Sequence, residues 1–280
     1  MGFRDLLILI KVRITALVTL TALAGYGLAP NPQGGWPLIE VAVGVFLITA
    51  GASIVNMFLE RRTDALMNRT RLRPLPLKIL TPAAALTLGL AISLAGLWPL
   101  LSADRLPAGI AALAWFLYVV VYTPLKSMTS LNTIVGAIPG ALPPLIGWTA
   151  TGAPLSMAAF IPFLLMFAWQ IPHFLALAWM YRDDYGRAGF PMLPVTDPGG
   201  RSAGRQALLY ACALLPASLV PAALGVSGTI YFWVALVLGV VMVALSWRFA
   251  TSRNERSAYA LFIGSIVYLP LIWVAMILNH

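Results

Sequence analysis

The stretch NMFLERRTDALMNRTRLRPLP, from Asn56 to Pro76, places two acids and five arginines directly behind an apolar segment at 37–59. The side chains of Asn56, Glu60 and Asp64 recur every four residues. On a helix, this spacing gives one polar stripe that drifts by about 80° and rises by about 12 Å. The stretch therefore predicts a membrane helix whose end leaves the bilayer carrying a row of oxygen ligands.

The composition of the whole chain agrees with a membrane location. Of its 280 residues, 60% are hydrophobic and only 10% are charged, whereas soluble domains are roughly half apolar and a quarter charged. Apolar runs of about 20 residues are long enough to cross a bilayer as helices, and they lack the alternation typical of a transmembrane barrel. We predict an all-α integral membrane protein, one domain over 1–280, with nine transmembrane helices at about 6–28, 37–59, 81–101, 107–123, 133–151, 158–181, 205–225, 228–250 and 257–278.

The distribution of charge predicts the orientation of this bundle. With nine spans, all but one of the 18 basic residues lie on the side of the N-terminus, and only Arg105 lies opposite. The positive-inside rule then places the N-terminus in the cytoplasm and the C-terminus outside, in a cell (inner or plasma) membrane. This partition explains the net charge of +9 without a nucleic-acid partner. The cytoplasmic connections that hold most of the acids and motifs are 60–80, 124–132 and 182–204.

The polar stripe is a candidate site for a metal ion and an anion. Stacked oxygen ligands such as those of Glu60 and Asp64 suit Mg²⁺, which proteins usually hold with one or two carboxylates plus substrate phosphates and water. Arg69 and Arg73 follow with forked donors for phosphate oxygens. Together these residues suit a diphosphate. The alternative is an interfacial helix end whose arginines contact anionic lipid.

A second group of candidates lies in WQIPHFLALAWMYRDDYGRAGFPMLP, from Trp169 to Pro194. Asp183 and Asp184 are separated by about 100° on a helix, so only one of them can face a site on that side. His173 lies roughly 12 Å inside the end of its span. An ionisable group at that depth is a functional candidate, as an iron ligand, a substrate contact or a proton relay. The alternative is a hydrogen bond between helices.

Cations also border two other spans. Lys126 and Asn132 lie where the span at 133–151 begins, and a lysine there can bind phosphate as a point charge. Lys11 and Arg13 enter the first span near the same face. Snorkelling toward the lipid head groups is the alternative explanation for these two.

Taken together, the three stretches resemble the UbiA superfamily of intramembrane prenyltransferases, and most closely its haem O synthase branch, the protohaem IX farnesyltransferases. The matching positions are Asn56, Glu60, Asp64, Met67, Arg69 and Thr70, then Tyr122, Thr123, Lys126, Asn132 and Gly136, then Trp169, Pro172, His173, Phe174, Asp184 and Tyr185. Two positions depart from the family pattern: Arg62 stands where an acid is common, and Val12 where a proline is common.

The resemblance implies transfer of a farnesyl group from farnesyl diphosphate to a vinyl group of haem B, giving haem O for terminal oxidases. It implies Mg²⁺ as cofactor, and a downstream haem A synthase or oxidase assembly as candidate partners. The implied roles are metal binding for Asn56, Glu60, Asp64 and Asp184; catalysis for Asp64, Asp184 and Lys126; diphosphate binding for Lys11, Arg13, Arg69, Arg73, Lys126 and Asn132; and haem contact for His173, Trp169 and Tyr181. Two alternatives stay open: a UbiA-type enzyme acting on an aromatic quinone precursor such as 4-hydroxybenzoate, and a transporter.

Overall fold

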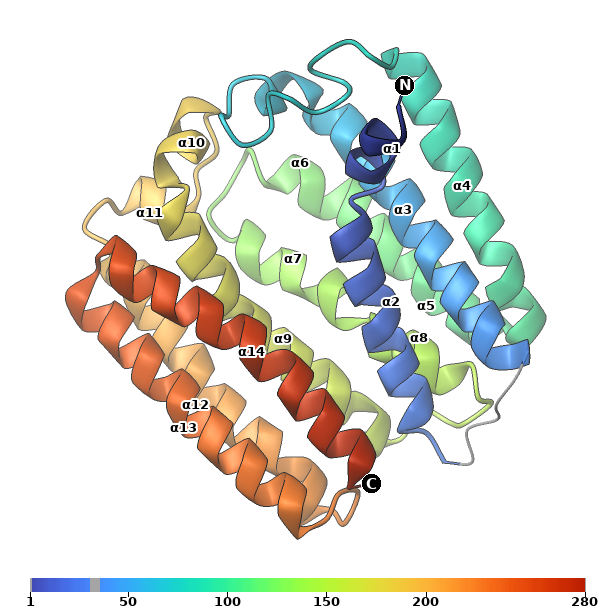
Figure 1. Ribbon diagram of the computed structural model, residues 1–280, viewed down its shortest axis with the longest axis vertical. Helices are drawn as coiled ribbons and strands as arrows, with labels where there is room; N and C mark the ends of the chain where they lie inside the picture. The colour runs from blue at the N-terminus through green and yellow to red at the C-terminus, as the bar shows by residue number, and fades with distance from the viewer. Residues whose placement is uncertain (1, 31–35, 280) are drawn as a thin grey trace.

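The computed structural model describes residues 2–30 and 36–279, and every regular element within them is a helix (Figure 1). The predicted all-α fold is confirmed. In chain order the helices are α1 (Phe3–Leu9), α2 (Val12–Gly27), α3 (Trp36–Asp64), α4 (Pro82–Ala103), α5 (Arg105–Phe116), the π-helix η1 (Leu117–Tyr122), α6 (Thr123–Leu125), α7 (Asn132–Ala141), α8 (Pro143–Thr149), α9 (Met157–Met180), α10 (Arg182–Arg187), α11 (Leu193–Thr196), α12 (Arg201–Ala223), α13 (Thr229–Ser252) and α14 (Glu255–Leu278).

Each predicted span corresponds to helical structure. Within the described residues, seven helical segments are long and apolar enough to cross a membrane, and α1 with α2, bent by 52°, would make an eighth span. The predicted span at 133–151 folds as two short helices, α7 and α8, on either side of Leu142. The start of α1 and the end of α14 lie at opposite ends of the bundle (Figure 1). The count of nine and the orientation of the termini stay predictions.

The outer surface of the bundle is apolar. Several large hydrophobic side chains are exposed on it. Leu94 and Trp98 of α4 are 67% and 77% exposed, and Trp233 of α13 is 58% exposed. Surfaces of this kind are unfavourable in water but suit the lipid around a membrane helix. The chain is a multi-pass membrane protein.

Glycines set the closest helix contacts in the first half of the bundle. A Cβ on Gly51 of α3 would lie 2.6 Å from the carbonyl oxygen of Gly89 on α4. On α8, a Cβ on Gly147 would lie 1.7 Å from the carbonyl oxygen of Ala22 on α2. Small residues let backbones approach in lipid, where packing rather than water exclusion joins helices. These contacts hold α3 against α4 and α8 against α2.

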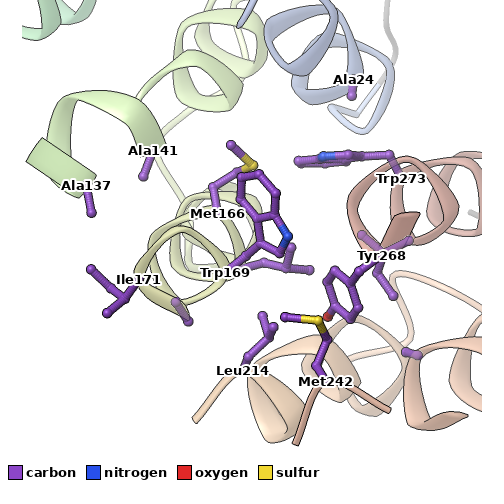
Figure 2. Packing of buried hydrophobic residues seen from close by; sticks show 14 of the residues in the cluster. Ala24, Ala137, Ala141, Met166, Trp169, Ile171, Leu214, Met242, Tyr268 and Trp273 are labelled. Atoms are coloured by element: carbon purple, nitrogen blue, oxygen red, sulfur yellow. The ribbon is translucent and has the colours of Figure 1, made fainter. Parts of the chain in front are cut away.

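The second half packs around α9. Trp169 of α9, Met242 of α13, and Tyr268 and Trp273 of α14 belong to one buried cluster (Figure 2). Helix α9 also contacts α7 and α8, which belong to the first half of the bundle. It is therefore the element that brings the predicted Trp169–Pro194 motif close to the rest of the site.

Candidate active site

A cavity of about 760 Å³ lies inside the bundle. That volume falls within the range of roughly 300–1,000 Å³ typical of small-molecule sites. Its polar part is at the basic end of the bundle, which we define as the end that carries 60–80 and 182–204. Among the described residues, five cationic and two carboxylate side chains line the cavity, an excess of three positive charges: Lys11, Arg13, Arg69, Arg73 and Lys126 against Glu60 and Asp64. Such an excess favours an anionic ligand.

The predicted polar stripe lies on the cavity wall. Helix α3 has 29 residues and is therefore roughly 43 Å long, more than the ~30 Å bilayer core. Its final turns carry Asn56, Glu60 and Asp64, whose residues are 2%, 6% and 0% exposed. All three line the cavity. The helical spacing read from the sequence therefore places them as predicted.

Each member of the stripe contacts a cation from another part of the chain. The Lys11 Nζ donates to Asn56 Oδ1 at 2.6 Å. The Lys126 Nζ lies 3.0 Å from Glu60 Oε1. The guanidinium of Arg73 donates to both oxygens of Asp64, at 2.8 and 2.9 Å. These pairs neutralise the buried carboxylates, which would be costly to leave alone in a low-dielectric interior.

Lys11 reaches Asn56 through an unusual backbone conformation. It lies at the 52° bend between α1 and α2, with φ at 48° in the left-handed region. Few residues other than glycine adopt this region, and such conformations cluster at functional sites. Lys11 thus lies at the bend between α1 and α2, and its cation contacts Asn56 at the inner end of the stripe.

Lys126 is held as a cation. Burial disfavours its charged form, but attraction to the Glu60 carboxylate prevails, and the pKa of Lys126 lies above its ordinary value. The Nζ atom also lies 5.1 Å from the ring centroid of Phe190 and 5.9 Å from that of Tyr122, distances at which aromatic faces attract a cation. Lys126 therefore stays charged at neutral pH.

Asp184 closes one edge of the site. Its carboxylate accepts from the backbone N–H groups of Asn68 and Arg69, at 3.3 and 3.2 Å, and pairs with Arg187 one helical turn further on. The side chain of Arg69 in turn donates to Tyr185 at 3.2 Å. Asp184 thus fastens the loop after α3 to α10, and it is not among the cavity-lining side chains of the described residues. Metal binding by Asp184 stays a prediction. The structure shows a second role, in which its carboxylate holds the loop after α3.

Asp184→Ala is expected to loosen the loop after α3. Removal of the carboxylate leaves the amides of Asn68 and Arg69 without their acceptor, so trypsin should cleave after Arg69 and Arg71 several-fold faster than in the wild type. The measurement is a digestion time course on protein in lipid nanodiscs, read by mass spectrometry.

The matched control for this prediction is Asp183→Ala, because Asp183 makes no such contact among the described residues. Equal cleavage rates for the two variants would contradict the loop-holding role.

Only two of the three predicted haem contacts are among the described residues that line the cavity. His173 and Trp169 line the cavity on α9, and their rings stack with 4.9 Å between centroids. Tyr181 lies instead beneath the guanidinium of Arg69, which is 4.8 Å from its ring centroid. Asn132 is fully buried, and its side-chain amide donates to the carbonyl of Thr129 at 2.6 Å. Neither Tyr181 nor Asn132 is a cavity-lining residue in the described chain.

Three cavity-lining tyrosines, Tyr118, Tyr122 and Tyr185, were given no predicted role, although Tyr122 and Tyr185 are among the positions that match the family pattern. Tyr118 and Tyr122 line the cavity from η1, with stacked rings 5.8 Å apart, and the Lys11 Nζ lies 3.4 Å from the Tyr118 hydroxyl. A π-helical turn within an otherwise regular span is rare and is frequent at functional sites. The spacing 118, 122, 126 was the available sequence signal, since it places both tyrosines near Lys126.

The oxygen atoms on this cavity wall suit a divalent cation that binds together with a phosphate-containing ligand. No cluster of three or more His, Cys, Asp or Glu in residues 2–30 and 36–279 could hold a metal by itself. Two carboxylates and an amide on one cavity wall nevertheless match Mg²⁺, because this ion commonly takes only one or two protein carboxylates and completes its shell with phosphate oxygens and water. Glu60, Asp64 and Asn56 are the residues that would hold it.

Residues 18–273 match the family model described as the UbiA prenyltransferase family. The chain belongs to this family. It is 42% identical over 290 residues to the protoheme IX farnesyltransferase of Solibacter usitatus (strain Ellin6076), with 99% of each chain covered. This finding confirms the predicted family, and family membership disfavours the transporter alternative.

Solved structures show the same fold at low sequence identity. A structure of digeranylgeranylglyceryl phosphate synthase in membranes superposes with a TM-score of 0.83 at 16% identity, covering 99% of this chain and 97% of that one. A UbiA homologue from Archaeoglobus fulgidus bound to GPP and Mg²⁺ gives 0.66 at 14% identity, covering 97% and 99%. The UbiA-type helical bundle is therefore the fold of this chain.

Proposed function

We propose that this protein transfers the farnesyl group of farnesyl diphosphate to a vinyl group of haem B and so makes haem O. The observation that carries the proposal is one continuous cavity, cationic at the basic end and apolar in the interior. A prenyl diphosphate has the matching form, an anionic head and an apolar tail. The acceptor is inferred from the curated relatives that are named protoheme IX farnesyltransferase.

The head group is proposed to lie at the polar end of the cavity. Lys11, Lys126 and Arg73 now contact the stripe on α3, and Arg69 borders the same space. When a diphosphate enters, these cations can turn to its oxygens. A divalent cation held by the freed Glu60 and Asp64, as supported by the Mg²⁺-bound relative, supplies charge neutralisation for the leaving group.

The interior of the cavity divides between the two substrates in this proposal. The tail lies beside apolar side chains of α3, α5 and α8, including Ile48, Ala111 and Ile146. The acceptor lies beside α9 and α14, where Trp169 and Phe262 line the wall. Both positions lead to the same polar end, so the reacting carbon of the farnesyl group meets the acceptor below the diphosphate.

The reaction begins with breakage of the bond between C1 of the farnesyl group and the diphosphate oxygen. The electron pair leaves with the diphosphate, and Lys126, Arg69 and Arg73, turned to its oxygens, stabilise the charge that develops there. The vinyl π pair then bonds to C1, and water adds to the new cation next to the porphyrin and loses a proton. Haem B, farnesyl diphosphate and water thus give haem O and diphosphate. The apolar walls keep other water from the first cation.

We further propose that the protein lies in the cell membrane with its basic end facing the cytoplasm. Arg13, one of the cavity-lining cations, is exposed at that end. Membranes favour this orientation because positively charged loops are retained inside. Haem O made there would pass to a haem A synthase or terminal oxidase in the same bilayer.

The test of the function is the haem content of a host that lacks its own haem O synthase and expresses this chain. Mass spectrometry of the extracted haem should show a hydroxyethylfarnesyl derivative. Isolated membranes should also transfer label from farnesyl diphosphate to haem B rather than to 4-hydroxybenzoate. Labelled 4-hydroxybenzoate with unchanged haem B would reject the haem acceptor and favour the quinone-precursor alternative.

A further inference from the structure

The imidazole of His173 is held on three sides. Trp169 and Phe262 each stack on it with 4.9 Å between ring centroids, at interplanar angles of 22° and 28°. An imidazole is too small to stack with two aromatic rings on one face, so these residues cover its two faces. Its Nδ1 atom lies 2.8 Å from the hydroxyl oxygen of Ser265 on α14. The ring is therefore fixed in both position and rotation.

The contacts of Ser265 determine which ring nitrogen carries the proton. The hydroxyl of Ser265 donates its one hydrogen to the carbonyl oxygen of Phe262 at 2.6 Å. Toward His173 it can then act only as an acceptor, so Nδ1 of the neutral imidazole must be the donor. The lone pair of the neutral ring is consequently on Nε2.

The open edge of this ring faces the cavity. His173 lines the cavity, both ring faces and Nδ1 are already occupied, and Phe174 contacts the ring edge-on with 5.3 Å between centroids. Nε2 has no hydrogen-bond partner among the described residues, yet it is not one of the polar atoms sealed away without a partner. A directed lone pair therefore points into the part of the cavity that lies beside α9 and α14.

We propose that Nε2 of His173 is an axial ligand of the iron of the acceptor porphyrin, and that Ser265 is the positioning residue that keeps this lone pair available. The proposal rests on the proposed function, in which haem is the acceptor. Imidazole nitrogen is a common ligand of haem iron, and a ligating histidine usually donates its other N–H to a fixed oxygen. Trp169 and Phe262 then act by keeping the ring in one orientation.

Iron ligation can be separated from shape recognition by comparing two macrocycles. Wild-type protein in nanodiscs is titrated with haem B and with iron-free protoporphyrin IX, and the dissociation constants are read from absorption changes. His173→Ala should weaken haem B binding by at least roughly 10–100-fold, because loss of only an outer-shell partner of a metal ligand already costs that much. It should leave protoporphyrin IX binding unchanged, and added imidazole should restore the wild-type haem spectrum.

The role of Ser265 is tested by two substitutions and a matched control. Ser265→Ala should weaken haem B but not protoporphyrin IX binding and should weaken the iron–histidine stretch in the resonance Raman spectrum, whereas Ser265→Thr, which keeps the acceptor oxygen, should behave as wild type. The control is Ser218→Ala on α12, because the Ser218 hydroxyl also donates to a carbonyl three residues earlier, that of Leu215, but has no contact with His173 among the described residues.

The outcomes separate this proposal from the function on which it rests. If His173→Ala weakens the binding of haem B and of protoporphyrin IX equally, or weakens neither, iron ligation is overturned while haem can still be the acceptor. If wild-type protein binds neither macrocycle, the haem acceptor itself fails and the ligation proposal fails with it.

Discussion

Asp64→Asn is expected to lower farnesyl transfer by at least about 10²-fold, the scale on which removing one fixed stabilising group acts on kcat. Asp64 is fully buried on the cavity wall and accepts both hydrogen bonds of Arg73. The amide keeps the size and one acceptor oxygen but loses the charge that would hold a divalent cation beside the diphosphate. The measurement is the initial rate of labelled farnesyl transfer as a function of Mg²⁺ concentration.

The matched control for Asp64→Asn is Glu255→Gln. Glu255 also pairs with an arginine at the basic end, Arg182 at 3.4 Å, but its side chain is 70% exposed and lies outside the cavity lining. An exposed pair of this kind contributes roughly 0–1 kcal/mol, so this variant should keep near-wild-type rates and stability. Wild-type transfer by Asp64→Asn at limiting Mg²⁺, with normal insertion, would reject the proposed metal role of Asp64.

Lys126→Met should have the second large effect, on both activity and stability. The substitution removes a cation from the proposed leaving-group site and leaves Glu60, 6% exposed, without its ion-pair partner. Breaking one side of a buried pair typically costs about 3–5 kcal/mol. The double variant Lys126→Met/Glu60→Gln should recover most of the lost unfolding free energy but not the transfer rate.

The chemistry of Lys126 also gives an expectation for pH. Its pKa is raised by Glu60 above the ordinary value of 10.5, although burial opposes the charged form. The pair's contribution to stability is then present at lower pH and is lost only as pH rises through the raised pKa. Between about pH 6 and 9, titration of Lys126 should change neither stability nor rate.

The controls for these expectations are one conservative variant and one comparison of pH profiles. Lys126→Arg keeps the charge and should retain more activity than Lys126→Met. A transfer rate that falls between pH 7 and 9 in the wild type but not in Lys126→Arg would contradict a lysine that stays charged over this range.

Much of the bundle is predictable because lipid imposes a length on apolar helices. The expected span at 158–181 is α9, Met157–Met180, and the expected span at 81–101 is α4, Pro82–Ala103. The stripe of Asn56, Glu60 and Asp64 is equally local, since its geometry follows from four-residue spacing. The π-helical turn of η1 is less visible, because a membrane span is apolar on all sides and a shift of helical register does not interrupt its apolar run.

By itself the sequence determined the membrane helices, the charged end of the bundle, the oxygen stripe and the resemblance to a prenyltransferase family. These features depend on residues near one another in the chain. Only the tertiary structure showed that Lys126 pairs with Glu60 across 66 residues, that Asp184 holds the amide of Arg69 across 115, and that Ser265 orients His173 across 92. Such partners depend on how distant helices pack against one another, and no spacing along the chain records that packing.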